Sequence, residues 1–371
     1  MEALVELSRF YGADPDYVLA GGGNTSWKDG GILYVKGSGT ALAEASAATF
    51  VKMDRNALAL IWEKKYPESS AERESAVLSD MMAARMPGEE QKRPSVETLL
   101  HDILPFAFIA HFHPALVNGV ACSRQDEAAM REIFGKEPIW VSSVNPGYVL
   151  SRLVKTAMDA YREEYRKSAS VIFLQNHGIF VGADSIGGIK EQYGEVMEKI
   201  GDRIKRRPDF SGVTITSGSD AADTAGIIAQ ALIELSGSAA FMSGGEIAAL
   251  VKDRSSFAPV SSAFTPDHIV YSGGDPLFTD AADGTGVRRA WEDHVQKTGR
   301  NPKVIAVQGL GVFGVAAAEK AARLALDLFK DTVKIACYAE SFGGPLFMTQ
   351  DQIDFINNWE VERFRSCVSV K

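Results

Sequence analysis

Three histidines and one glutamate are the residues of this chain whose types and spacing could do chemistry. His111 and His113 lie in the run Ile-Ala-His-Phe-His-Pro, His177 lies in Leu-Gln-Asn-His-Gly-Ile-Phe, and Glu97 lies in Pro-Ser-Val-Glu-Thr. The chain has six histidines, so half of them fall in two apolar, strand-like segments. Three protein ligands that leave one position open are typical of a catalytic zinc ion.

The His-x-His spacing brings two of these imidazoles together. Side chains alternate between the faces of a strand, so His111 and His113 on one strand share a face. Two imidazoles on an apolar face are costly to bury without a shared partner, and a metal ion is such a partner. His177 alone is typical of a solvated turn, and it becomes a candidate ligand only because His111 and His113 form a pair. The sequence therefore predicts a metal site on these three histidines.

The elements expected around the histidines alternate between helix and strand. Strands are predicted over 32–36, 106–112, 139–141, 171–174 and 179–181. Helices are predicted over 1–18, 70–84, 98–104, 150–167 and 186–206. This pattern predicts an α/β fold with the histidines at strand ends and turns.

Glu97 and two glycine-rich loops are ambiguous on pattern alone. Glu97 begins an expected helix, where a carboxylate can simply favour the helix dipole. The loops Gly21–Ser26 and Gly37–Thr40 combine backbone N–H groups with Asn, Ser and Thr side chains, which suits a phosphate or another oxyanion. Neither loop is a P-loop, because the downstream Lys-Ser/Thr is missing, and a pair of tight turns explains them as well.

Composition excludes several classes of protein. The chain has 371 residues and 46% hydrophobic content, enough for two modest domains. No apolar run has the length of a membrane span, and the acidic, amphipathic N-terminus is typical of a helix rather than a signal peptide. A net charge of -9 argues against binding the nucleic-acid backbone. Cys122, Cys337 and Cys367 form no Cys-x-x-Cys pair and predict no disulfide framework. We expect a cytoplasmic protein without nucleic-acid or membrane partners.

The second half of the chain repeats part of the first. Residues 1–210 and 224–371 are the expected units, and the Ser-, Gly- and Thr-rich segment between them is the expected linker. The segment 171–180 recurs at 304–313, with Leu310 in the place of His177. We therefore expect the second unit to contain a partial, metal-free copy of the first.

A second interpretation exists for part of this repeat. The six residues 309–314 read Gly-Leu-Gly-Val-Phe-Gly, formally a dinucleotide fingerprint. Too few residues follow Gly314 for the rest of a two-half nucleotide fold. We therefore favour the repeat over a nucleotide site.

Taken in order, the motifs resemble the class II aldolase/adducin family. They are Gly-Asn-Thr-Ser at 23–26, Gly-Ser-Gly-Thr at 37–40, Ser-Val-Glu at 95–97, His-Phe-His at 111–113 and Asn-His-Gly at 176–178. The resemblance covers roughly residues 1–205. Residues 22–28 and the long C-terminal extension resemble the aldolase half of fused rhamnulose-1-phosphate aldolase/alcohol dehydrogenase proteins. The resemblance implies a three-layer α/β/α domain with a central mixed, largely antiparallel sheet, followed by a C-terminal α/β region.

The resemblance also implies an activity. It implies a zinc-dependent aldolase that cleaves a ketose 1-phosphate, of the rhamnulose- or fuculose-1-phosphate type, to dihydroxyacetone phosphate and an aldehyde through a metal-stabilised enediolate. Zinc, or another divalent cation, would be held by His111, His113 and His177, with Glu97 as catalytic acid/base. The positions that match phosphate ligands in the family are Asn24, Ser38, Gly39 and Ser95. A homo-oligomer, dimer or tetramer, is expected.

Some family features have no certain counterpart in this sequence. The family often takes a tyrosine from a neighbouring subunit to protonate the leaving alkoxide, and Tyr148 lies in that region but several residues out of alignment. From the second half, His268 and Tyr271 could reach the site, although a structural role is favoured for both.

Two alternatives to the aldolase remain. A pentulose-phosphate 4-epimerase or sugar-phosphate dehydratase of the same family could use the same metal, and the sequence does not separate these from the aldolase. A non-catalytic, adducin-like module is the other alternative. The intact histidine set argues against it, because a binding module has no need of three convergent imidazoles.

Overall fold

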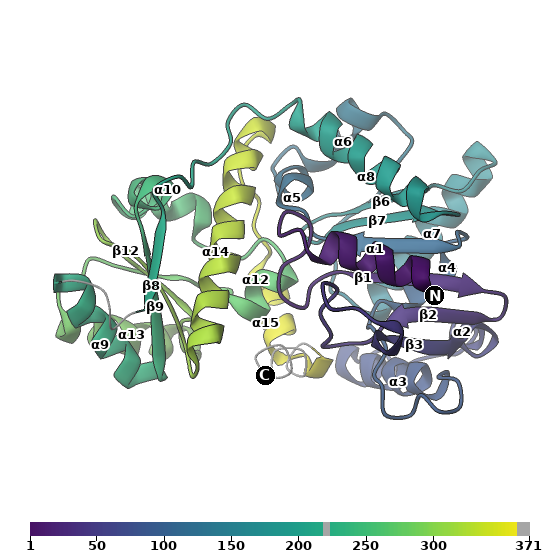
Figure 1. Cartoon of the computed structure of the whole chain (residues 1–371), viewed down its shortest axis with the longest axis horizontal. Helices are drawn as coiled ribbons and strands as arrows, with labels where there is room; N and C mark the ends of the chain where they lie inside the picture. The colour runs from purple at the N-terminus through teal and green to yellow at the C-terminus, as the bar shows by residue number, and fades with distance from the viewer. Residues whose placement is uncertain (218–222, 362–371) are drawn as a thin grey trace.

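The computed structural model describes residues 1–217 and 223–361, which form two α/β units side by side. The N-terminal unit runs from α1 (Glu2–Gly12) to α8 (Ile186–Gly201). The C-terminal unit begins with β8 (Thr214–Ser217) and ends with α15 (Gln350–Asn358). The long helix α14 (Glu319–Ala339) lies between the two sheets (Figure 1).

The sheet of the N-terminal unit carries the histidines. In the described part of the chain its order is β3-β2-β1-β4-β7-β6-β5. The strands are β1 (Asn24–Asp29), β2 (Ile32–Lys36), β3 (Phe50–Asp54), β4 (Phe108–Phe112), β5 (Ile139–Val141), β6 (Val171–Leu174) and β7 (Gly178–Ala183). Only the β5–β6 pair among them is parallel, so the sheet is mixed and largely antiparallel, as predicted.

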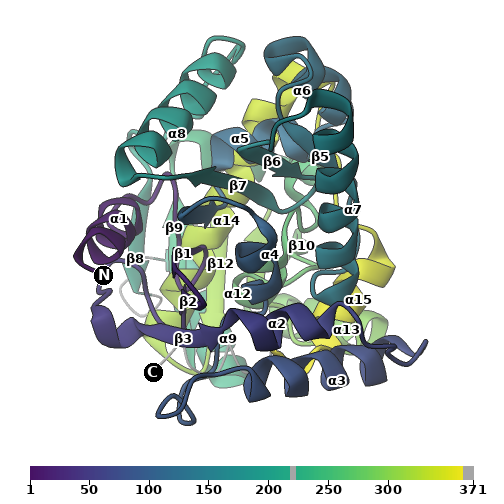
Figure 2. The ribbon, with the colours of Figure 1, turned by 90° about the vertical axis from the view of Figure 1, so that its right-hand side faces the viewer.

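Helices cover both faces of this sheet, which confirms the predicted three-layer fold. On one face lie α1, α5 (Ala115–Ala121) and α8, and on the other lie α4 (Thr98–Ile103) and α7 (Tyr148–Tyr165) (Figure 2). The remaining helices are α2 (Arg55–Ile61), α3 (Ser70–Ala83) and α6 (Asp126–Phe134). Along β4, Ala110 and Phe112 pack toward the α8 side and Ile109 toward the α7 side. The alternation of a strand therefore places His111 on the α4–α7 side.

The C-terminal unit has a second sheet, of order β10-β11-β12-β9-β8 within the described residues. Its strands besides β8 are β9 (Ser238–Ser243), β10 (Leu277–Thr279), β11 (Val304–Val307) and β12 (Gly311–Ala316). Its helices besides α14 and α15 are α9 (Asp223–Ser236), α10 (Gly245–Leu250), α11 (Arg254–Phe257), α12 (Pro266–Tyr271) and α13 (Gly284–Thr298). The expected linker is thus partly a strand, because Thr214–Ser217 pair with β9 at the sheet edge. Residues 218–222 of that linker lie outside the described residues.

The two sheets share one topology and one register. The order β4-β7-β6-β5 has its counterpart in β9-β12-β11-β10, and in each set only the last pair is parallel. Ile172 pairs with Phe180 in the first hairpin, as Ile305 pairs with Phe313 in the second. We infer from this correspondence that the C-terminal unit is a degenerate copy of the N-terminal one.

The same register shows what stands in place of the metal ligands. His111 is opposite Phe180, whereas Phe241 is opposite Phe313. Counting along the equivalent strands and turns puts Ser243 in the place of His113 and Leu310 in the place of His177. None of these replacements is a metal ligand of the imidazole type, so the copy retains the strands without the donor set.

The glycine motif at 309–314 belongs to this second hairpin. Gly311 pairs with Val307 and Gly314 with Val304 in an antiparallel ladder, so the motif occupies a hairpin turn and β12. A dinucleotide fingerprint instead occupies the turn between a parallel strand and a helix. Gly314 allows close packing of α14, because a Cβ there would lie 2.3 Å from the Ala322 carbonyl oxygen. The geometry therefore favours the repeat.

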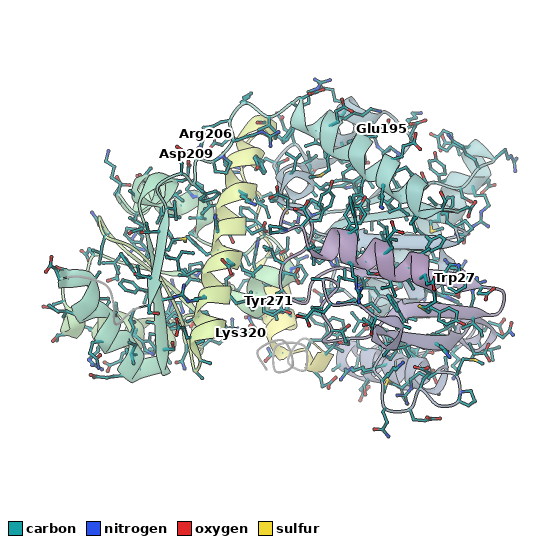
Figure 3. All side chains as sticks on the ribbon, viewed as in Figure 1. Trp27, Glu195, Arg206, Asp209, Tyr271 and Lys320 are labelled. Carbon is teal, nitrogen blue, oxygen red and sulfur yellow. The ribbon has the colours of Figure 1, made fainter. Side chains whose placement is uncertain are left out.

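The two units are packed into one body. A single hydrophobic cluster contains Val117 and Val120 of α5 together with Phe329 and Val333 of α14. Arg206 lies in the connection between the units (Figure 3). Its side chain forms ion pairs with Glu246 and Glu340. In the described residues, no helix combines the length and apolar character needed to cross a bilayer.

Candidate metal centre

The three predicted histidines converge at the end of the N-terminal sheet. Each of His111, His113 and His177 offers a ring nitrogen, and these atoms all lie within 4.8 Å of one another. His111 is on β4, His113 follows the end of that strand, and His177 lies in the turn between β6 and β7. The β4–β7 ladder, which pairs Phe112 with Ile179, joins the His-x-His segment to this turn.

Hydrogen bonds at the far side of two rings set their tautomers. His111 Nδ1–H donates to the Ile179 carbonyl oxygen at 3.0 Å, and His113 Nδ1–H donates to Asp267 Oδ2 at 2.6 Å. Each Nε2 therefore carries a lone pair, and the two Nε2 atoms are 2.9 Å apart. Two lone pairs at this distance repel unless a cation lies between them. The donor set thus fits a divalent metal ion.

Glu97 completes the cluster. Its Oε1 lies 3.2 Å from His111 Nε2 and 3.4 Å from His177 Nε2. Oε1 is buried without a hydrogen-bond partner among the described residues, which is the environment of a carboxylate oxygen facing a cation. Glu97 is the N-cap residue of α4, but its side chain forms no capping hydrogen bond. Side-chain capping therefore does not account for this carboxylate.

A chain of buried hydrogen bonds holds the other oxygen of Glu97. Asn24 Nδ2 donates to Glu97 Oε2 at 2.6 Å, and Asn24 Oδ1 accepts from His101 Nε2. Ser26 Oγ is 2.7 Å from His101 Nδ1 and closes the chain. The sequence reasoning missed His101. Its signal was the spacing of four residues from Glu97, one helical turn beyond the N-cap residue of α4.

Asn24 lies at the site because it belongs to a strand, which the sequence did not indicate. It was expected in a glycine-rich loop, and it is instead the first residue of β1, directly opposite His111 in the β1–β4 pair. Two adjacent strands therefore align the amide with the metal-binding face.

Burial governs the protonation of the cluster. Burial lowers the pKa of His111, and it lowers the pKa of His101 and of His177 to about 3. Burial raises the pKa of Glu97, but the His111 and His177 rings and the Asn24 amide lower it by more, so its pKa lies well below the usual range. These directions favour neutral His111 and His177 rings and an ionised Glu97, the protonation states that bind metal.

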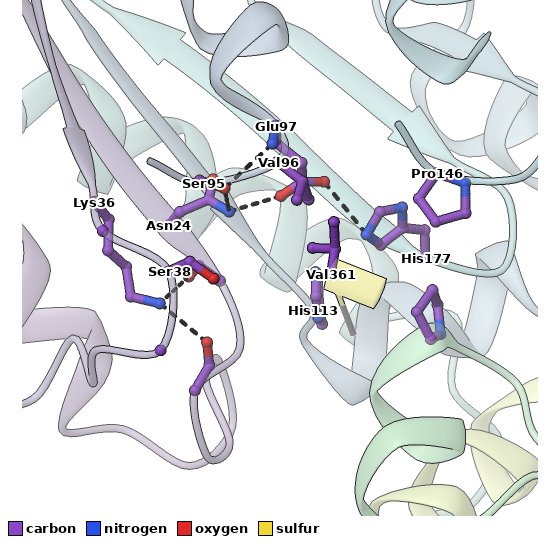
Figure 4. Close-up of a pocket in the computed structure, with 15 residues that line it drawn as sticks. Asn24, Lys36, Ser38, Ser95, Val96, Glu97, His113, Pro146, His177 and Val361 are labelled. Carbon is purple, nitrogen blue, oxygen red and sulfur yellow. Dashed lines mark hydrogen bonds and ion pairs between the residues drawn. The ribbon is translucent and has the colours of Figure 1, made fainter. Parts of the chain in front are cut away.

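A pocket opens directly in front of this cluster (Figure 4). It is lined by the residues predicted to bind phosphate, Asn24, Ser38, Gly39 and Ser95, together with Glu97, His113, His177, Lys36, Pro146, Pro266 and Val361. Lys36 Nζ donates to the carbonyl oxygens of Gly21 and Gly23, at 3.0 Å each, and so ties the first glycine-rich loop to the end of β2, where the second loop begins. Two of the three histidines, Glu97 and the two glycine-rich loops thus line one cavity.

The further candidates from the sequence lie elsewhere. Tyr148 packs against Trp62 and Tyr66, in the core beside α3. His268 Nε2 pairs with Asp331 Oδ2 at 3.1 Å. Neither residue lines the pocket, and the same is true of Tyr271. The residue of this segment that does reach the cluster is Asp267.

A family model and a curated relative match this chain. The family model described as Class II Aldolase and Adducin N-terminal domain matches residues 2–198. The uncharacterized oxidoreductase YuxG of Bacillus subtilis strain 168 is 27% identical over 227 residues, which is 57% of this chain and 31% of that protein. The chain thus spans about a third of the length of this curated relative.

Solved structures resemble the N-terminal part of the chain. The N-terminal class II aldolase domain of a conserved Thermoplasma acidophilum protein is 26% identical, with a TM-score of 0.45, and covers 54% of this chain and 91% of that one. The L-fuculose-1-phosphate aldolase of Thermus thermophilus is 17% identical, with a TM-score of 0.35. The match covers 54% of this chain and 91% of the aldolase. Since the family model alone spans more than half of the residues, this chain belongs to the class II aldolase and adducin family.

Proposed function

We propose that the protein is a divalent-metal-dependent aldolase, with zinc as the metal, that cleaves a ketose 1-phosphate of the rhamnulose- or fuculose-1-phosphate type to dihydroxyacetone phosphate and an aldehyde. The observation that carries the proposal is the convergence of three imidazoles and a buried carboxylate beside a pocket that both glycine-rich loops line. An interaction module would not require this combination.

The phosphate would be bound at the loop end of the pocket. Ser95 Oγ accepts hydrogen bonds from Glu97 N–H and Asn24 Nδ2–H, each at 3.2 Å, which leaves its own proton to donate to a phosphate oxygen. Ser38 and Gly39 belong to the second loop, where Thr40 Oγ1 donates to the Gly37 carbonyl oxygen at 2.8 Å and holds the turn. A Ser side chain and glycine backbone N–H groups suit an oxyanion.

The carbon chemistry would occur at the histidine end. Cleavage removes a proton from the hydroxyl beside the breaking carbon–carbon bond and later adds a proton to the carbon of the ketone fragment. When bound by His111, His113 and His177, the cation would supply Lewis acidity against the negative charge that develops on substrate oxygen. Glu97 would carry the proton, because Asn24 holds its Oε2 and leaves Oε1 at the reacting end.

The proposal is tested by loading the protein with zinc and supplying a panel of ketose 1-phosphates. Release of dihydroxyacetone phosphate is coupled to NADH oxidation, and the same samples are measured after chelation. His177→Ala should abolish release, while His294→Ala, a histidine outside this pocket, should retain it. An isomerised or dehydrated sugar phosphate without dihydroxyacetone phosphate would contradict the aldolase and support the epimerase or dehydratase alternative.

A further inference from the structure

One ligand of the candidate centre is held by the other half of the chain. His111 is oriented by the backbone of its neighbouring strand, at the Ile179 carbonyl oxygen. His113 is oriented instead by Asp267, 154 residues further along, in the first turn of α12. The nitrogen and oxygen atoms are 2.6 Å apart, the short distance of a hydrogen bond to an ionised acceptor.

The surroundings of Asp267 bring its carboxylate close to the N-terminal unit. A Cβ on Gly22 would lie 2.8 Å from Asp267 Oδ2, so only glycine at this position leaves room for the carboxylate. On the far side, α12 is fixed to α14 by the His268–Asp331 pair and by the buried contacts of Ile269. The carboxylate is therefore held between a glycine of the first unit and a helix of the second.

We propose that Asp267 is a positioning residue for the metal centre. Resting on the proposed metal-dependent function, this inference assigns to the C-terminal unit a part in forming the site. Asp267 keeps the Nδ1–H tautomer of His113, prevents the ring from rotating and makes Nε2 a stronger donor. Carboxylate partners of this kind orient metal-bound imidazoles, and their loss typically weakens metal affinity about 10–100-fold.

The test measures zinc affinity of the full chain by competition with a chromophoric chelator. Asp267→Ala should weaken binding by about 10–100-fold. Asp267→Asn keeps an oxygen that can accept from Nδ1–H but removes the charge, so its affinity should lie between wild type and Asp267→Ala. Gly22→Ala, which crowds the carboxylate, should weaken binding while leaving Asp267 itself unchanged. The d–d spectrum of the cobalt-substituted protein reports ligand geometry independently of turnover.

Glu74→Gln is the matched control. It also removes the charge of a buried carboxylate, one that accepts from Tyr148 N–H at 2.9 Å and does not line the pocket. A purely structural role for Asp267 predicts equal effects of Asp267→Asn and Glu74→Gln on zinc affinity and on the cobalt spectrum. The positioning role predicts that only Asp267→Asn changes them.

The outcomes separate this inference from the proposed function. If the wild-type chain binds zinc and Asp267→Ala binds it as tightly, the inference is overturned while the metal centre stands. If Asp267→Ala weakens zinc binding and wild type cleaves no ketose 1-phosphate, the inference stands and the proposed substrate is wrong. If wild type binds no zinc, both are overturned.

Discussion

Replacing Glu97 by glutamine is the most direct test of how this site would work. The substitution preserves the size of the side chain and removes its charge and its capacity to carry a proton. Because Asn24 Nδ2 is a donor 2.6 Å from Oε2, the glutamine must present its oxygen to Asn24. Its NH2 group then faces the His111 and His177 Nε2 atoms, which are 3.2 and 3.4 Å from the native Oε1.

The expected loss follows from that orientation. An amide in the position of Oε1 can donate to an imidazole lone pair but cannot accept the substrate proton. Removal of a general acid/base typically costs about 10²–10⁴-fold in rate. This corresponds to roughly 3–5 kcal/mol of transition-state stabilisation. The three imidazoles remain, so zinc should still bind when supplied in excess.

The assay compares kcat of Glu97→Gln and wild type at saturating zinc, with bound metal measured by mass spectrometry in the same samples. Glu74→Gln is the control, since it also removes a buried carboxylate, one that accepts from Tyr148 N–H at 2.9 Å outside this pocket. It should retain kcat. A zinc-bound Glu97→Gln within about threefold of wild type, less than 1 kcal/mol, would remove Glu97 from the mechanism.

Three further outcomes are expected. Wild type should bind about one zinc ion per chain, the number that one set of three ligands allows, and His177→Ala or a chelator should remove it. Gly178→Ala should lower the free energy of unfolding by about 1–3 kcal/mol in denaturant, because its Cβ would lie 2.6 Å from His113 Cδ2. Burial lowers the pKa of Lys28 to about 7 from 10.5, so the unfolded chain binds more protons between these values. Stability should therefore rise with pH across that window, and Lys28→Met should flatten the rise.

The cluster of three candidate metal ligands could be predicted from the sequence because its geometry is local. The two-residue period of a strand puts His111 and His113 on one face, and a hairpin turn brings His177 to the end of the adjacent strand. Their apolar neighbours identified both strands, which the structure gives as β4 (Phe108–Phe112) and β6 (Val171–Leu174). The prediction thus needed only short-range pattern.

The partners of those ligands could not be predicted, because they depend on how distant elements pack. His101 lies one turn beyond Glu97, the N-cap residue of α4, but its contact with Asn24 arises only after β1 pairs with β4. Asp267 reaches His113 only after the second unit folds against the first. The sequence indicated its neighbour His268 as a candidate, because an imidazole is a recognisable metal ligand. Asp267 was not singled out, because an aspartate near the start of a helix is common.

The second unit shows which residues of the shared strand pattern are required for packing and which would be required only for metal binding. Phe241 and Phe313 keep a ring pair, with centroids 4.7 Å apart, where the first unit pairs His111 with Phe180 at 4.0 Å. A buried strand must be covered on both faces, so its apolar character persists whether or not a metal is bound. A metal ligand has no such structural requirement, and Phe241 occupies the register position equivalent to His111. The residue of this unit that contacts the histidine cluster lies instead outside the strands that correspond to those of the first unit. The segment between β9 and β10 has no need to form the hairpin, and it carries α12 and Asp267 to the site of the first unit.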